Sequence, residues 1–213
     1  IKGGEPFADK SNMIILEQLA KVNPECYVLI NTNFILISKY IKLLKKFKNI
    51  DVDGSIDGIY DQYEWIRSSK WKKLLEQVDI YTNETGKKIN INVTVSLYNI
   101  MNLNDIIKYW TNSPFCESIN AINVVYFPTI TSHKFLKQEY LNMFYDRIDT
   151  HFKQHYKILP RPTPFNKEEL QIKYSNKYYF QLIKKWIEIV DEERKFKLED
   201  CVPEFNFIEE MVI

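Results

Sequence analysis

The sequence has little glycine, little cysteine and no excess of either charge, and each shortage excludes a class of protein. Its 213 residues include five glycines and three cysteines, with 29 lysines and arginines against 28 aspartates and glutamates. A net charge of +1 provides no broad basic surface for nucleic acid or for an anionic membrane. The 45% hydrophobic and 27% charged content excludes a disordered or collagen-like chain and predicts an ordinary folded domain.

The chain also lacks long apolar runs. No run approaches the ~18 residues of a membrane span, and no charged-then-apolar signal segment begins the sequence. The cysteines Cys26, Cys116 and Cys201 are far apart and odd in number, which favours free thiols in a reducing compartment. We therefore expect a cytoplasmic protein with no membrane partner and no indication of a nucleic-acid partner. The first residue is Ile1 rather than methionine, which suggests a fragment or a processed chain.

Short strand-like runs alternate with longer amphipathic stretches along the chain. We expect strands at 26–30, 50–56, 89–96 and 121–127, and helices at 11–22, 35–47, 61–79, 103–110, 135–156 and 168–194. In the first helix the apolar residues that recur at helical spacing are Ile14, Ile15, Leu19 and Val22. The alternation predicts parallel strands joined by right-handed crossovers, and therefore an α/β sheet or barrel.

Polar residues gather where the expected strands end. Ligands of parallel α/β sheets bind at the carboxyl ends of the strands, so these residues are candidates for a binding site. They are Gly3, Gly4, Glu5 and Pro6 before the first helix, Thr32 and Asn33 after the first strand, Ser55 and Asp57 after the second, and Asn99 after the third. Gly3 and Gly4 would let backbone pass close to a ligand, and the Glu5 carboxylate beside them suits an ammonium group.

Each of these motifs also has a purely structural interpretation. Gly3 and Gly4 can form a simple turn with a solvated Glu5. The pairs at 53–54 and 57–58 can form hairpin turns; a calcium loop there lacks the distant glutamate of a dozen-residue frame. His151 and His155 lie four residues apart on an expected helix, but no third metal ligand is evident, so a solvated pair is favoured.

The order and spacing of these motifs resemble the core of radical S-adenosylmethionine (radical SAM) enzymes. The stretch 3–7 is similar to their GGEP motif, and 31–33 is similar to their TNG strand. The stretch 55–58, followed by Arg67, is similar to their S-[IL]-D-G element with its arginine, and 94–99 follows in order. The resemblance covers residues 1–130 well and the remainder weakly, where 191–194 and 202–204 look like the ends of proteins with a short twitch extension.

The resemblance implies a partial (β/α)6 barrel of the TIM type with a C-terminal helical extension. Residues 1–158 would form the core, from the end of strand 2 to the helix after strand 6. Residues 159–213 would form a proline-rich linker, a C-terminal helix and a twitch-like tail. Such a barrel binds S-adenosylmethionine (SAM) at its top rim, where a [4Fe-4S] cluster cleaves it to a 5′-deoxyadenosyl radical with electrons from a donor protein.

The resemblance also assigns roles to single residues. Gly3, Gly4 and Glu5 would hold the methionine ammonium, Ser55 would contact the ribose, and Arg67 would contact the methionine carboxylate. A surface arginine on a helix is the plainer interpretation of Arg67. The remaining candidates for the same rim are Pro6, Thr32, Asn33, Asp57 and Asn99.

The sequence departs from the family in two places. The C-x3-C-x2-C cluster motif is absent, and the three separate cysteines cannot replace it, because the thiolates must converge from one short loop. Phe34 stands where the glycine of the TNG strand is expected. We therefore expect an enzyme only in a longer protein with the cluster ligands upstream. The alternatives are a non-catalytic α/β module that binds SAM or another nucleoside, and a pure interaction module. The substrate is not indicated.

Overall fold

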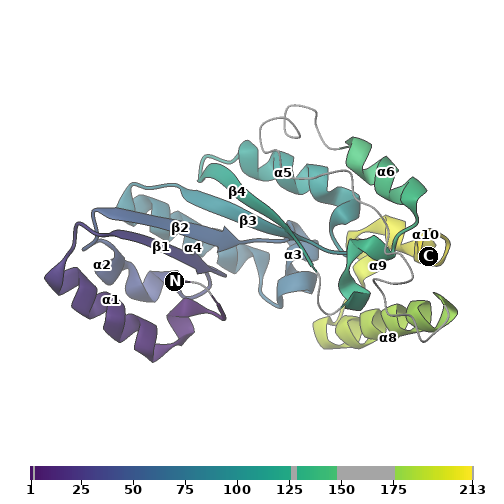
Figure 1. The fold of residues 1–213 in the computed structure, drawn as a ribbon, viewed down its shortest axis with the longest axis horizontal. Helices are drawn as coiled ribbons and strands as arrows, with labels where there is room; N and C mark the ends of the chain where they lie inside the picture. Colours follow the sequence, from purple (N-terminus) through teal and green to yellow (C-terminus); the bar gives the residue numbers. More distant parts are fainter. Residues whose placement is uncertain (2, 126–128, 148–175, 213) are drawn as a thin grey trace. The chain divides into compact units, whose positions relative to one another are not determined.

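The computed structural model of the chain describes residues 1, 3–125, 129–147 and 176–212 (Figure 1). The α-helices and strands are α1 (Lys10–Val22), β1 (Tyr27–Thr32), α2 (Ile41–Leu44), β2 (Asn49–Ser55), α3 (Tyr60–Arg67), α4 (Trp71–Thr85), β3 (Ile89–Val95), α5 (Leu103–Thr111), β4 (Cys116–Val124), α6 (Gln138–Arg147), α8 (Asn176–Arg194), α9 (Leu198–Cys201) and α10 (Ile208–Met211). Short 3-10 helices are η1 (Pro6–Ala8), η2 (Ile37–Tyr40), η3 (Ile100–Asn102), η4 (Thr129–Thr131), η5 (His133–Phe135) and η6 (Pro203–Phe207). His151, His155 and the expected boundary after residue 158 lie outside the described residues.

The strands form one sheet in the order β1-β2-β3-β4, with β1 parallel to β2 and β2 parallel to β3. The prediction of an α/β fold with a parallel sheet is therefore confirmed. Residue 1 also pairs with β1. The Ile1 amino group donates to Leu29 O at 2.5 Å, and Asn31 N donates to Ile1 O at 3.1 Å, which is the hydrogen-bond pattern of a parallel bridge.

The chain folds into two compact units built from interleaved stretches. The first unit contains residues 1–56, 69–93 and 108–121, and the second contains 57–68, 94–107 and 122–213. Among the described residues, no helix is both long and apolar enough to cross a membrane.

In the first unit, alternation along the strands separates an apolar sheet face from a polar one. Val28 and Ile30 of β1, Val52 of β2, and Ile89 and Ile91 of β3 are buried on one face. Helices α1, α2 and α4 lie on one side of the sheet (Figure 1). The apolar face is thus the core of this unit, because its burial provides most of the favourable free energy.

Helix α1 confirms the predicted helix but buries a different stripe. Its buried residues are Met13, Leu16 and Ala20, whereas Ile14 and Ile15 are more than half exposed. Both sets of residues have helical spacing, so periodicity alone could not distinguish them. The Asp9 side chain caps the helix by accepting from Ser11 N at 2.8 Å.

Two predicted helices are interrupted in the structure. The stretch 61–79 forms α3 and α4, because Ser68 ends α3 in the left-handed conformation at φ +54°. The stretch 35–47 contains η2 followed by the single turn of α2, although Ile37 and Leu44 are both fully buried as the pattern indicates. Neither interruption carries a glycine or proline, so the usual signals were missing.

The second unit is organised around Trp65 of α3. The Trp65 Nε1 donates to Asp191 Oδ1 of α8 at 2.7 Å, and Arg194 Nε donates to Trp65 O at 3.2 Å. The Tyr98 ring packs edge-on against Trp65 at a centroid distance of 4.9 Å. His133 is buried in the same unit, and burial lowers the pKa of its imidazole to about 4. Trp65, Tyr98 and the neutral His133 therefore belong to the core of this unit.

Candidate functional site

Glu5 is held by the carboxyl end of β1 in the first unit. Its Oε1 accepts from Thr32 Oγ1 at 2.6 Å and from Phe7 N at 3.1 Å, and its Oε2 accepts from Asn33 N at 2.7 Å. The side chain is only half-buried, so the carboxylate is fixed in position while it remains accessible. Each carboxylate oxygen has two acceptor sites, which leaves one at Oε2 for a further donor such as an ammonium group. Glu5, Thr32 and Asn33 thus share one cluster.

Gly3 and Gly4 both need glycine for their backbone conformation. Their φ angles are +100° and +57°, and no atom lies within 4 Å of a Cβ built on either residue. A side chain at these positions would be strained without meeting any neighbour in the structure. Pro6 is buried at the first position of η1. The two glycines therefore determine the backbone conformation that leads into Glu5.

Phe34 occupies the turn after β1 with the backbone that a glycine would adopt. Its φ is +70°, and its side chain is fully buried with the ring edge-on to Tyr81 at a centroid distance of 5.8 Å. A Cβ on Gly54 would lie 3.2 Å from the Phe34 ring. The missing side chain at Gly54 therefore makes room for Phe34. The turn therefore adopts a left-handed conformation although it has no glycine.

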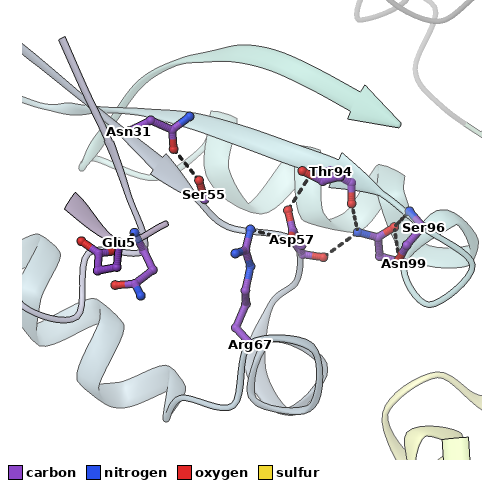
Figure 2. A network of polar contacts seen from close by, with 9 residues as sticks. Glu5, Asn31, Ser55, Asp57, Arg67, Thr94, Ser96 and Asn99 are labelled. Atoms are coloured by element: carbon purple, nitrogen blue, oxygen red, sulfur yellow. Dashed lines mark hydrogen bonds and ion pairs between the residues drawn. The ribbon is translucent and has the colours of Figure 1, made fainter. Parts of the chain in front are cut away.

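Ser55 ends β2 and contacts β1 in the first unit. Its Oγ donates to Asn31 Oδ1 at 2.5 Å (Figure 2). Both side chains are partly exposed. Asn31 was not among the predicted site residues, although it stands two residues before Asn33 in the same motif. The pair offers a hydroxyl and an amide, which are suitable partners for a ligand hydroxyl.

Asp57 and Arg67 form an ion pair in the second unit. Arg67 Nη2 lies 2.6 Å from Asp57 Oδ2, and Thr94 N donates to Asp57 Oδ1 at 2.7 Å (Figure 2). Burial raises the pKa of the Asp57 carboxyl above its ordinary value, whereas the Arg67 guanidinium and the Thr94 N–H act in the opposite direction. The Arg67 Nε is buried and has no hydrogen-bond partner. The Arg67 side chain is 27% exposed, so a ligand could reach its Nη groups but not the buried Nε.

Asn99 joins the loop of Asp57 to the end of β3 within the second unit. It is fully buried, and its Nδ2 donates to Asp57 O at 2.8 Å and to Thr94 O at 2.9 Å (Figure 2). Its Oδ1 accepts from Ser96 N at 2.8 Å. These bonds occupy the amide, so Asn99 positions Asp57 and Thr94 and offers no free group to a ligand.

The three cysteines do not suit an iron–sulfur cluster. Cys26 and Cys116 belong to the first unit and Cys201 to the second, and all are free thiols. Burial raises the pKa of Cys116 and Cys201 to about 11, which favours the thiol over the thiolate that binds iron. Within the described ranges, no group of three or more histidine, cysteine or acidic side chains could hold a metal ion.

The second unit contains a cavity of about 620 Å³ that is not lined by Asp57, Arg67 or Asn99. Its polar lining includes Asn104, Asp105, Arg147 and Glu204. None of the predicted binding-site residues lines this cavity. Arg147 and Glu204 are already paired at 3.3 Å. The motif residues instead form two clusters, one in each unit, centred on Glu5 and on the Asp57–Arg67 pair.

The sequence matches no protein-family model and no curated protein.

Proposed function

We propose that this chain binds SAM and is part of a radical SAM enzyme built on a partial (β/α)6 barrel. The order of the motifs suggests the family, and the geometry of Glu5 is the observation that carries the proposal. A carboxylate held by Thr32, Asn33 and Phe7, with one acceptor site left over, suits the ammonium of the methionine moiety.

Arg67, which belongs to the second unit, is proposed to contact the methionine carboxylate, as the resemblance implies. Its guanidinium has five N–H donors in a planar fork, and Asp57 uses only part of them. A guanidinium with spare donors suits the methionine carboxylate. Ser55 and Asn31 are suited to the ribose hydroxyls. Each of these groups is thus chemically suited to one part of SAM.

Reductive cleavage is proposed only for a longer protein that supplies the cluster ligands. In such a protein a [4Fe-4S] cluster would supply the electron for cleavage of SAM, and Cys26, Cys116 and Cys201 do not fit it. The same observation favours a second candidate, a non-catalytic SAM-binding module. Formation of 5′-deoxyadenosine by the protein from the complete reading frame, after iron and sulfide reconstitution, distinguishes the two.

Glu5→Gln is expected to weaken SAM binding about tenfold or more, because a neutral amide replaces a charge-assisted hydrogen bond. Equilibrium dialysis with radiolabelled SAM measures the dissociation constant. Glu17→Gln is the matched control, because Glu17 is an exposed carboxylate on α1, and its affinity should stay within about twofold. No saturable binding to the unaltered chain would overturn the proposal. If Glu5→Gln binds SAM as tightly as the unaltered chain does, Glu5 does not contact the ammonium group of SAM.

A further inference from the structure

A second polar cluster lies on the sheet of the first unit, and no motif of the proposed function includes it. Its centre is Asp53 of β2, whose side chain is only 4% exposed. Asp53 Oδ1 accepts from Asn90 Nδ2 at 3.3 Å and from Asn120 Nδ2 at 3.1 Å, and Oδ2 accepts from Asn92 Nδ2 at 3.1 Å. Strands β3 and β4 thus contribute three amides to one carboxylate on β2, and we call these four residues together with Ser118 the Asp53 cluster.

The cluster contains a buried charge that has no counter-charge. Among the residues that the structure describes, no lysine, arginine or histidine forms an ion pair with Asp53. The four strands of the sheet contain Asp51, Asp53 and Glu117 but no basic residue. Buried carboxylates in proteins are normally paired with a cation, so this cluster lacks a positively charged partner.

The cluster also lacks hydrogen-bond donors. Asn92 is 6% exposed, and its Nδ2 is directed to Asp53, which leaves the buried Oδ1 with no partner. Ser118 Oγ lies 2.8 Å from Asn90 Oδ1 and 2.9 Å from Asn120 Oδ1, although a hydroxyl has only one proton to donate. Two amide oxygens therefore compete for one donor while a third has none. A ligand that brings several N–H groups would satisfy them.

We propose that the Asp53 cluster binds the ammonium group of a cationic ligand. An alkylammonium provides one positive charge and three N–H donors, which match the uncompensated carboxylate and the amide oxygens short of donors. Asn120 is exposed, and Asn90 and Ser118 are partly exposed, so the cluster is reached from the polar face of the sheet. The proposal concerns a ligand site distinct from Glu5 and does not depend on SAM binding.

The test uses n-butylammonium as the probe and 1-butanol as its neutral counterpart. Side-chain amide signals of Asn90, Asn92 and Asn120 are followed by ¹H–¹⁵N NMR during each titration. We expect saturable shifts with a dissociation constant on the order of 1 mM for n-butylammonium and no saturable shift for 1-butanol. Asp53→Asn is expected to weaken binding about tenfold or more, because it removes the charge and keeps the shape.

Asp51→Asn is the matched control, since Asp51 is an exposed carboxylate two residues away on the same strand. It should leave the affinity for n-butylammonium within about twofold. The proposal is wrong if n-butylammonium leaves the three amide signals unchanged, or if 1-butanol binds equally well. It is also wrong if folded Asp53→Asn binds as the unaltered chain does, because the cluster would then only hold the strands together. Equilibrium dialysis with SAM is repeated on Asp53→Asn and Asp51→Asn. Unchanged SAM binding by both variants is expected, because the Asp53 cluster is distinct from Glu5.

Discussion

Asn99→Ala is expected to destabilise the protein by about 3 kcal/mol. The fully buried amide forms three short hydrogen bonds to backbone groups of Asp57, Thr94 and Ser96. Alanine removes these partners from two carbonyls and one N–H that are buried or partly buried, and each loss costs about 1 kcal/mol. Urea denaturation followed by circular dichroism measures the change in the free energy of unfolding.

Asn83→Ala is the matched control for this experiment. Asn83 lies exposed on α4, so its replacement should change the free energy of unfolding by less than about 0.5 kcal/mol. A loss below about 1 kcal/mol for Asn99→Ala would contradict the positioning role of Asn99. In that case Asp57 would be held mainly by Arg67 and by Thr94 N.

Phe34→Ala is expected to cost about 4 kcal/mol, because it removes a fully buried aromatic ring between Tyr81 and Gly54. Phe34→Gly should cost about 1 kcal/mol less than Phe34→Ala, since only glycine adopts a φ of +70° without strain. This order is the reverse of the usual one, in which glycine is the more damaging replacement. Chemical denaturation of both variants measures the difference.

The comparison of the two variants isolates the backbone from the side chain. Both remove the same ring, so any difference between them comes from the last methyl group and from the conformation at residue 34. A glycine variant less stable than the alanine variant would show that the turn does not need the left-handed conformation. The conclusion that residue 34 favours glycine would then be wrong.

Much of the fold could be predicted because its signals are local. The alternating pattern of β3 and the apolar spacing of α5 each lie within one short stretch. The interruptions did not have such signals. Ser68 takes a left-handed conformation without being glycine, and the choice between the Ile14 and Leu16 stripes of α1 depends on the sheet that the helix covers.

In the candidate site, too, the features with local sequence signals could be predicted and those that depend on the fold could not. The Glu5 motif indicated a carboxylate beside two glycines, and the structure adds its partners Thr32 and Asn33. The Asp53 cluster was missed because its members are contributed by three strands far apart in the sequence. One signal was available. Acidic and amide residues alternate along β2 and β3, with Asp51 and Asp53 followed by Asn90 and Asn92, which indicates a polar sheet face.

The most direct test of the proposed function compares SAM with 5′-methylthioadenosine, which has the nucleoside but lacks the amino-acid group. Calorimetric titration of the chain measures both dissociation constants. If Glu5 holds the methionine ammonium, SAM should bind at least about tenfold more tightly, since the analogue lacks this ammonium as well as the sulfonium charge. Equal affinities, or no binding of SAM, would contradict the proposal.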